Sequence, residues 1–293
     1  GVSINNQIRK VPSAHIIVAT PGRLCDLMDR RVIDLSTVKT AVLDEADRML
    51  DMGFIKDVGY ILKKTPKNRQ TLMFSATIPR MIERLIERHM HKPKVVKIKD
   101  QVDTKLLKQY YYDLPTSQRF HLLVHLLKNE KSPHAIVFCA TRRVVDLVSR
   151  NLKRNGVNAA ALHGGLTQAM RKKVMTSFQG KDTKVLVASD IAARGIDVKL
   201  LTHVYNYDVP KTSEDYTHRI GRTARAGEDG IAITLVSEKD HRAFQEVLRN
   251  PSLKIIRQEL PEFDMVEFIH SAPRRRQATH QRGPRRFDSR RRR

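Results

Sequence analysis

The stretch Thr40-Ala41-Val42-Leu43-Asp44-Glu45-Ala46-Asp47 joins a short apolar run directly to three carboxylates. Short, continuous apolar runs are typical of strands in a parallel sheet that is covered on both faces. Carboxylates at the C-terminal end of such a strand lie at the edge where α/β sheets bind ligands. Oxygen ligands at this edge suit Mg²⁺ beside a nucleotide, although acidic residues here also serve as ordinary helix N-terminal charges.

Similar apolar runs recur along the chain, and each is followed by a segment with a helical pattern. They cover residues 15–19, 40–43, 71–74, 94–98, 135–138, 159–162, 185–188, 203–207 and 231–235. Strand and helix in alternation predict an α/β fold with right-handed crossovers and open parallel sheets. We expect a first domain over residues 1–98, a polar linker over 99–107 and a second domain over 108–261. Residues 262–293 then form an Arg-rich tail that we expect to be mostly disordered.

Two of the expected helices carry clear end signals. From Arg142 to Asn155 the apolar residues fall largely on one stripe, and Gly156 is a suitable stop. The second helix runs from Thr167 to Phe178 and begins with a residue that commonly caps helix N-termini.

The chain is strongly basic, with a net charge of +24 over 293 residues and 40% hydrophobic residues. Residues 271–293 hold ten arginines and one acid, so the remainder is basic by itself. This charge favours nucleic acid as a partner, although a solvated basic face needs no ligand. No apolar run is long enough to span a membrane, and we expect no membrane partner. Two cysteines are too few for a disulfide scaffold or a zinc site, so we expect a reducing cytoplasm.

Two further motifs follow strands of the first half. Thr20-Pro21-Gly22-Arg23 follows the run at 15–19, and Ser75-Ala76-Thr77 follows the run at 71–74. Taken separately, they are a turn and a helix cap. Because all the strands are expected to be parallel, these loops and the acidic loop share one edge of the sheet.

The second half repeats this arrangement. His163-Gly164-Gly165 follows one strand, with Gln168 and Arg171 at the start of the next helix, and Ser189 follows another strand. Residues 218–227 read His-Arg-Ile-Gly-Arg-Thr-Ala-Arg-Ala-Gly, which spaces three arginines three apart. On a helical turn these would project to one side and grip phosphate oxygens, unless they form a solvated basic face.

In this order and spacing, the motifs resemble those of the DEAD-box ATP-dependent RNA helicases, over residues 1–261. The resemblance implies two RecA-like domains, ATP and Mg²⁺ as cofactors, and RNA bound through its backbone with little sequence preference. In the first domain it implies that Asp44 reaches Mg²⁺ through water and that Glu45 positions the attacking water. It also implies that Ser75 and Thr77 couple nucleotide state to RNA binding through hydrogen bonds to Asp47.

The resemblance gives roles to the second domain as well. Arg222 and Arg225 are implied as catalytic arginine fingers, His218 and Arg219 as links to the first domain, and Gly195 and Asp197 as nucleotide contacts. The implied RNA-backbone contacts are Gly1, Thr20, Pro21, Gly22, Arg23, Gly164, Gly165, Gln168, Arg171 and Ser189.

The sequence departs from the family pattern in three places. No Gly-x-x-x-x-Gly-Lys-Ser/Thr run occurs in the 293 residues. We therefore expect a chain truncated before its phosphate loop, a less stable first half and no useful hydrolysis. Ser189 stands where Thr is commoner, and Ala224 where Gly is commoner, which is tolerable unless φ is positive.

Two other functions remain open from the sequence. One is a non-catalytic RNA-binding or annealing module, and the other is a DNA helicase, which the DEAD form of the acidic motif disfavours. The tail either tethers RNA without sequence preference or serves only as a solubilising end. We expect a cytoplasmic monomer.

Overall fold

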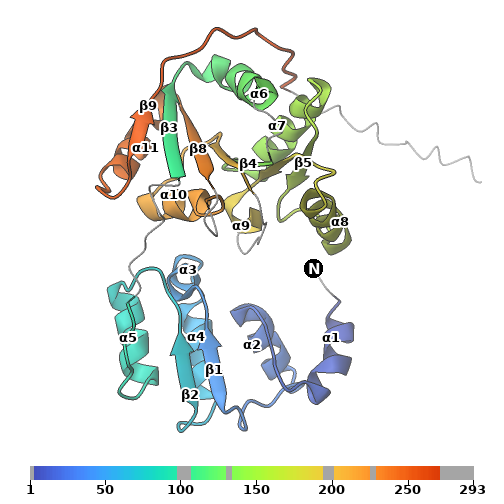
Figure 1. Ribbon diagram of the computed structural model, residues 1–293. Coiled ribbons are helices and arrows are strands. Elements are labelled where there is room, and N and C mark those ends of the chain that lie inside the picture. Colours follow the sequence, from blue (N-terminus) through green and yellow to red (C-terminus); the bar gives the residue numbers. More distant parts are fainter. Residues whose placement is uncertain (1–2, 98–106, 130–133, 194–200, 225–228, 271–293) are drawn as a thin grey trace, which may run out of the picture. The chain divides into compact units, whose positions relative to one another are not determined.

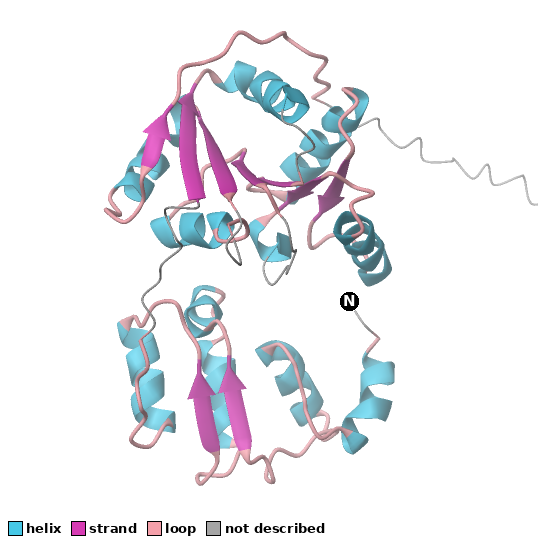
Figure 2. Ribbon diagram, in the orientation of Figure 1, coloured by secondary structure: helices cyan, strands magenta, loops and turns pink. Residues whose placement is uncertain are grey.

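The computed structural model describes residues 3–97, 107–129, 134–193, 201–224 and 229–270. The chain divides into two compact units, residues 1–100 (unit 1) and 101–293 (unit 2) (Figures 1 and 2). The division falls inside the predicted linker range. None of the described helices has both the length and the apolar character that crossing a membrane requires.

The described part of unit 1 is a two-stranded parallel sheet with helices. Its elements are α1 (Ile4–Lys10), η1 (Val11–Ser13), α2 (Pro21–Asp29), β1 (Thr40–Leu43), α3 (Ala46–Asp51), α4 (Ile55–Lys63), β2 (Gln70–Met73) and α5 (Arg80–His89). β1 and β2 pair from Thr40 opposite Gln70 to Leu43 opposite Met73. A small core beneath α4 and α5 joins Leu43, Val58, Leu62 and Leu85.

Two of the strands predicted for the first half are wrong. Residues 15–19 form no strand, and neither do residues 94–97, the described part of the run at 94–98. No strand among the described residues pairs with either run, and Val18 is 95% exposed. On the sheet itself Val42 is 55% exposed and Phe74, just beyond β2, is 56% exposed, so apolar surface stays open to water.

Unit 2 is a larger α/β unit. Its elements are β3 (Leu107–Asp113), η2 (Thr116–Gln118), α6 (Arg119–Asn129), β4 (Ala135–Phe138), α7 (Arg142–Arg154), β5 (Ala159–Leu162), α8 (Gln168–Gln179), β6 (Val185–Ala188), α9 (Asp190–Ala193), β7 (His203–Asn206), α10 (Ser213–Ile220), β8 (Gly230–Val236), η3 (Glu238–Asp240), α11 (His241–Leu248) and β9 (Ile255–Arg257). All five strands predicted for this half are present. β3 and β9 were not predicted.

The seven strands of unit 2 are parallel, in the order β5-β6-β4-β7-β8-β3-β9. Alternate residues of β4 serve the two faces of the sheet. Ala135 and Val137 pack under α6 and α7, whereas Ile136 and Phe138 pack under α8 and α9. α10 and α11 complete this second face beside β8. Because all strands run the same way, the loops after them meet at one edge of the sheet.

The predicted helix ends of unit 2 are confirmed. The Thr141 side chain caps α7 by accepting from the Val144 N–H at 3.2 Å, and Thr167 caps α8 by accepting from Met170 at 3.3 Å. Gly156 ends the α7 segment at φ +79°. At this angle a side chain would be strained, so a glycine is favoured.

Residues 262–270, called the strap below, correct the predicted domain limit at residue 261. The strap has no regular secondary structure, yet Phe263, Val266 and Phe268 pack on the core beneath α6 and α7. The Asn151 side-chain amide donates to the Ile269 carbonyl at 3.2 Å and its oxygen accepts from the Ile269 N–H at 2.8 Å. The ordered part of unit 2 therefore includes the first nine residues assigned to the tail, and residues 271–293 lie outside the described residues.

Limited proteolysis should remove unit 1 before unit 2. Two-stranded sheets are marginal by themselves, and the apolar side chains of unit 1 are poorly covered. Trypsin should first cleave within residues 3–97 and leave a resistant fragment that holds residues 107–270, identified by mass spectrometry. A resistant fragment from unit 1 that outlasts unit 2 would contradict this expectation.

The strap should loosen in acid. Burial lowers the pKa of His121 from its ordinary value of 6.5, and its Nδ1 accepts the Val266 N–H at 2.9 Å. The folded state binds a proton at His121 less readily than the unfolded state does. The contribution of neutral His121 to the stability of the fold is therefore complete above pH 6.5 and is lost as the pH falls below that value. Hydrogen exchange across residues 263–269, corrected for intrinsic rates, should accelerate below that pH. A His121→Gln variant should show a flatter pH dependence, and the same dependence in both proteins would contradict the argument.

Candidate functional site

Asp44 and Glu45 lie at the C-terminal end of β1, and both residues are exposed. Glu45 adopts a left-handed conformation at φ +52° before α3 begins, and its N–H donates to Asp44 Oδ1 at 3.0 Å. Such conformations of non-glycine residues cluster at functional sites. An exposed carboxylate here fits Mg²⁺ that keeps several waters and binds ligand phosphates. Within the part of the chain that the structure describes, no group of three or more His, Cys, Asp or Glu could hold a metal alone.

Asp47 joins the acidic loop to the loop after β2. Its carboxylate Oδ2 accepts from the Thr77 N–H at 2.9 Å and from the Thr77 hydroxyl at 3.2 Å. The Asp47 N–H donates to Ser75 Oγ at 3.1 Å, and the Ser75 hydroxyl donates to the Thr77 carbonyl at 2.6 Å. The hydrogen bonds predicted between these residues are therefore present, and they fix the two loops of unit 1 against each other.

Thr20 to Arg23 form the start of α2. Pro21 is buried in the first turn, where its missing N–H costs nothing. A Cβ built on Gly22 would come no closer than 4.0 Å to any neighbouring heavy atom, so packing within the chain does not demand a glycine. Arg23 Nη1 lies 3.4 Å from Asp26 Oδ2.

In unit 2, His163 holds the Gly164–Gly165 loop. The Gly165 N–H donates to His163 Nδ1 at 3.1 Å, so Nε2 carries the proton and donates to Asp146 Oδ1 at 3.0 Å. A Cβ on Gly165 would lie only 3.0 Å from His163 Nδ1. The glycine therefore allows the imidazole to close over the loop.

The other RNA residues predicted for unit 2 lie at this same sheet edge. Ser189 follows β6, which pairs with β5, the strand that precedes the glycine loop. Gln168 is the first residue of α8 and is exposed, and Arg171 lies one turn later and is half-buried. The structure thus brings together residues that the sequence separates by up to 25 positions.

The contacts that the structure gives Arg219 lie within unit 2. Its side chain is 4% exposed, and it forms a bidentate pair with Asp190 at 2.6 and 2.8 Å. Its Nη1 donates to Asn206 Oδ1 at 3.1 Å and to the Asp208 carbonyl at 2.6 Å. All three guanidinium nitrogens donate within unit 2, so Arg219 orients the loop after β6.

The arginine motif is also less helical than predicted. α10 ends at Ile220, so Arg222 lies in the following turn and does not share a helix face with Arg219. Ala224 has φ +54°, so the backbone is in the left-handed region. A Cβ is strained there, and the alanine is less favourable than a glycine would be. A Cβ on Gly230 would lie 2.5 Å from Thr223 Oγ1, so β8 passes directly beneath this turn.

Four predicted residues lie outside the described residues. They are Gly1, Gly195, Asp197 and Arg225. His218 is half-buried in the last turn of α10.

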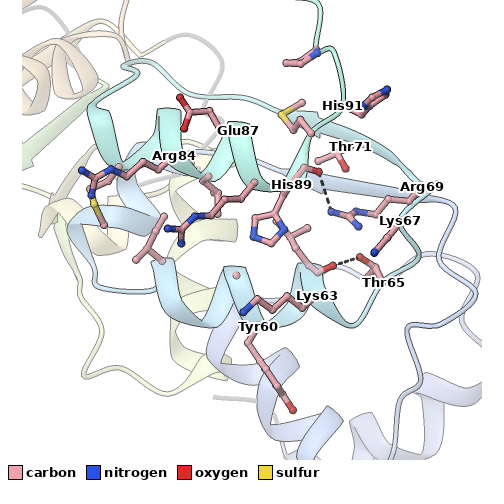
Figure 3. A pocket seen from close by; sticks show the side chains of 18 of the residues that line it. Tyr60, Lys63, Thr65, Lys67, Arg69, Thr71, Arg84, Glu87, His89 and His91 are labelled. Carbon is pink, nitrogen blue, oxygen red and sulfur yellow. Dashed lines mark hydrogen bonds between the residues drawn. The ribbon is translucent and has the colours of Figure 1, made fainter.

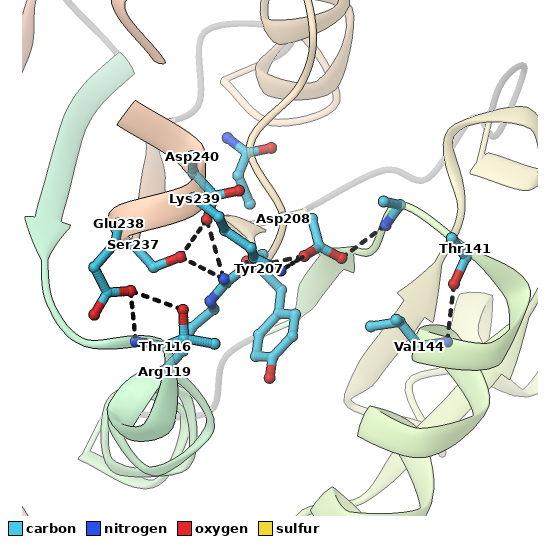
Figure 4. A network of polar contacts seen from close by, with 12 residues as sticks. Thr116, Arg119, Thr141, Val144, Tyr207, Asp208, Ser237, Glu238, Lys239 and Asp240 are labelled. Atoms are coloured by element: carbon cyan, nitrogen blue, oxygen red, sulfur yellow. Dashed lines mark hydrogen bonds and ion pairs between the residues drawn. The ribbon is translucent and has the colours of Figure 1, made fainter. Parts of the chain in front are cut away.

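Sequence analysis missed a second buried arginine (Figure 4). Arg119, at the start of α6, pairs with Asp208 Oδ1 and Asp240 Oδ2, both at 3.0 Å, and donates to the Tyr207 carbonyl at 2.7 Å. Asp208 Oδ2 accepts the Ala140 N–H at 2.9 Å. Burial raises the pKa of Tyr207. No local pattern signals this network, since Arg119 and Asp208 are 89 positions apart.

Unit 1 also has a basic hollow of about 1290 Å³ between α4 and α5 (Figure 3). Lys63, Lys67, Arg69 and His89 line it, beside Gln70 at the start of β2. It lies at the opposite end of β2 from Ser75, and none of the predicted site residues lines it.

Two family models match the chain. The model described as DEAD/DEAH box helicase matches residues 1–85, and that described as helicase conserved C-terminal domain matches residues 118–227. A DEAD-box ATP-dependent RNA helicase CshA of Bacillus cereus is 44% identical over 266 residues, which cover 90% of this chain and 51% of the relative. The CshA of Listeria monocytogenes is 48% identical over 242 residues, or 82% of this chain and 46% of the relative. The chain spans about half the length of these curated relatives.

Solved structures agree with these matches. Dbp5 of S. cerevisiae bound to RNA and ADP BeF3 has a TM-score of 0.76 at 30% identity, over 84% of this chain and 66% of that one. A DEAD box protein from Methanococcus jannaschii has a TM-score of 0.51 at 40% identity, over 88% of this chain and 70% of that one.

Replacing Ala224 by glycine should stabilise unit 2. The left-handed conformation costs an alanine about 1 kcal/mol, which glycine avoids. Urea unfolding of unit 2 should show a gain of that order. The matched control, Ala243→Gly inside α11, should instead lose about 1 kcal/mol. Equal losses in both variants would show that Ala224 carries no strain.

Proposed function

The chain belongs to the DEAD-box helicase family, and on this premise we propose that it is part of an ATP-dependent RNA helicase that binds the RNA backbone. The observation that carries this proposal is the edge of the unit 2 sheet. There Gly164, Gly165, Gln168, Arg171 and Ser189 lie on adjacent loops and one helix start. Backbone N–H groups, an amide, a hydroxyl and a guanidinium are donors for phosphate and ribose oxygens and are indifferent to sequence.

In unit 1 the proposed roles follow the loop geometry. The exposed Asp44 would hold Mg²⁺ through water beside the nucleotide, where the cation neutralises phosphate charge. Glu45 would orient the attacking water, whose oxygen bonds to the γ-phosphorus as the bond to the β–γ bridging oxygen breaks, giving ADP and phosphate. The Asp47–Thr77 hydrogen bonds would carry the nucleotide state to the RNA contacts at Thr20, Gly22 and Arg23.

In unit 2, Arg222 with Arg225 would stabilise the negative charge on the transferring phosphoryl group, and Gly195 and Asp197 would contact the nucleotide. Closure of the two units upon ATP and RNA would unwind short duplexes locally. Arg219 is assigned a positioning role through Asp190, and His218 keeps its proposed coupling role. A cytoplasmic monomer is part of the same proposal.

Hydrolysis by these 293 residues is proposed to be absent. Nucleotide phosphates in this class are cradled by a phosphate loop and its lysine, and the sequence contains no such run. The second candidate function, a non-catalytic RNA-binding or annealing module, is favoured by this same observation and by the basic charge.

The test measures RNA binding and ATP hydrolysis on the same preparation. Fluorescence anisotropy with a labelled oligouridylate should show binding that Arg171→Ala weakens by about tenfold. Lys172→Ala, one position further along α8 and exposed, removes the same charge and should have little effect. RNA-stimulated hydrolysis should stay at background.

The outcomes separate the candidates. Hydrolysis at a rate comparable to that of an intact family member would overturn the claim that the phosphate loop is needed. Equal effects of Arg171→Ala and Lys172→Ala would overturn the assigned RNA site. Strand annealing without any nucleotide effect would favour the non-catalytic module.

A further inference from the structure

The solvent face of α7 is a continuous basic stripe. Its exposed cations recur at helical spacing on the face opposite Val145, Val148 and Leu152, which are fully buried. The members of this stripe are Arg142, Arg143, Arg150, Lys153 and Arg154. A helix of 13 residues is about 20 Å long, so the stripe runs along that length.

Ordinary helix electrostatics explain only part of this stripe. Lys153 and Arg154 lie in the last turn, where cations favour the helix dipole. Arg142 and Arg143 lie in the first turn, which holds no acidic residue and where a cation is unfavourable. An anion along the helix would remove this conflict.

The carboxylates around the stripe leave most of its charge unbalanced. Asp146, the one acid within α7, accepts a hydrogen bond at Oδ1 from His163 Nε2 at 3.0 Å. Glu267 of the strap lies 3.9 Å from Arg154. Among the residues that the structure describes, no carboxylate lies within ion-pair distance of Arg142, Arg143 or Arg150.

One end of the stripe reaches the proposed RNA site. Arg142 lies over the glycine loop, because a Cβ on Gly164 would be 3.5 Å from Arg142 Nη2 and one on Gly165 would be 3.7 Å from Arg142 Cδ. An RNA strand that contacts this loop therefore already lies beside the first arginine of α7.

The strap packs beside the C-terminal half of α7 without covering the stripe. The Asn155 side chain donates to the Glu267 carbonyl at 2.9 Å, and Asn151 binds Ile269 at both its N–H and its carbonyl. The strap therefore runs back along α7 toward the start of the helix, while Arg150, Lys153 and Arg154 stay exposed.

We propose that α7 is an RNA-backbone track that leads a single strand from the Gly164–Gly165 loop along the solvent face of the helix. The inference rests on the proposed RNA binding of unit 2 and extends it. Phosphates along the strand replace the carboxylates that the stripe lacks. Such contacts add affinity in proportion to RNA length and carry no sequence preference.

The test uses the full chain and oligouridylates from about 4 to about 16 nucleotides long. Arg143→Glu/Arg150→Glu reverses two charges seven positions apart on the stripe. The matched control, Arg242→Glu/Arg249→Glu, reverses two exposed charges with the same spacing at α11, on the other face of the sheet. Circular dichroism verifies that both variants are folded.

The stripe variant should bind the longest RNA about tenfold more weakly than the control variant does, and the shortest RNA about equally. For the longest RNA, the slope of log binding constant against log salt concentration should be shallower by about 1.4 in the stripe variant. This change corresponds to the loss of two phosphate contacts on a single strand.

Three results would overturn the proposal, and a fourth would overturn the proposed function on which it rests. In the first, both double variants lose affinity equally, which shows only the effect of net charge. In the second, the stripe variant weakens short and long RNA by the same factor. If no oligouridylate binds the unaltered chain at any length, the proposed function itself fails. If short RNA binds and Arg171→Ala weakens it while the stripe variant changes nothing, only the track is wrong.

Discussion

The side chain and carbonyl of Asp208, at the end of β7, join two buried arginines that hold the functional edge of unit 2 in place. Its carboxylate accepts hydrogen bonds from Arg119 and from the Ala140 N–H. Its carbonyl accepts from Arg219, which also donates to Asp190. One residue thereby fixes the loops that follow β4, β6 and β7. Removing one partner of a buried pair leaves an uncompensated charge and typically costs 3–5 kcal/mol. The positions of Ser189 and of the arginine motif depend on this network.

Both units place polar residues in the loops that follow parallel strands, but the sheets that support these loops differ in size. In unit 1 the acidic loop and the Ser75–Thr77 loop are held by Asp47, at the ends of a sheet with only two described strands. In unit 2 seven parallel strands bury both faces of the sheet, and β6 is completely apolar. A buried sheet keeps its loop ends at fixed spacing, which the proposed RNA-backbone contacts require. The apolar surface left open on β1 and beside β2 is the physical reason why we expect the same arrangement to be less stable in unit 1.

Much of unit 2 could be predicted because its signals are local. The runs at 135–138 and 185–188 are continuous and apolar, and Thr141, Gly156 and Thr167 mark helix ends by their own chemistry. The strap could not be predicted. Its apolar residues are scattered among three acidic residues, without a period of two or 3.6, and their partners lie more than 100 positions away. The runs at 15–19 and 94–97 failed for the opposite reason, since an apolar run becomes a strand only when a neighbour pairs with it.

The sequence by itself determined the α/β class, the family, and the polar residues at the strand ends to which we assign the chemistry. These follow from motif order and from apolar runs, which act over a few residues. Only the tertiary structure decided that Arg219 faces Asp190 inside unit 2, that Ala224 is in the left-handed region, and that the strap lies along α7. Each of these is set by packing between distant segments. Burial makes a guanidinium satisfy its donors with whatever acceptors the fold brings close, and spacing along the chain does not reveal which those are.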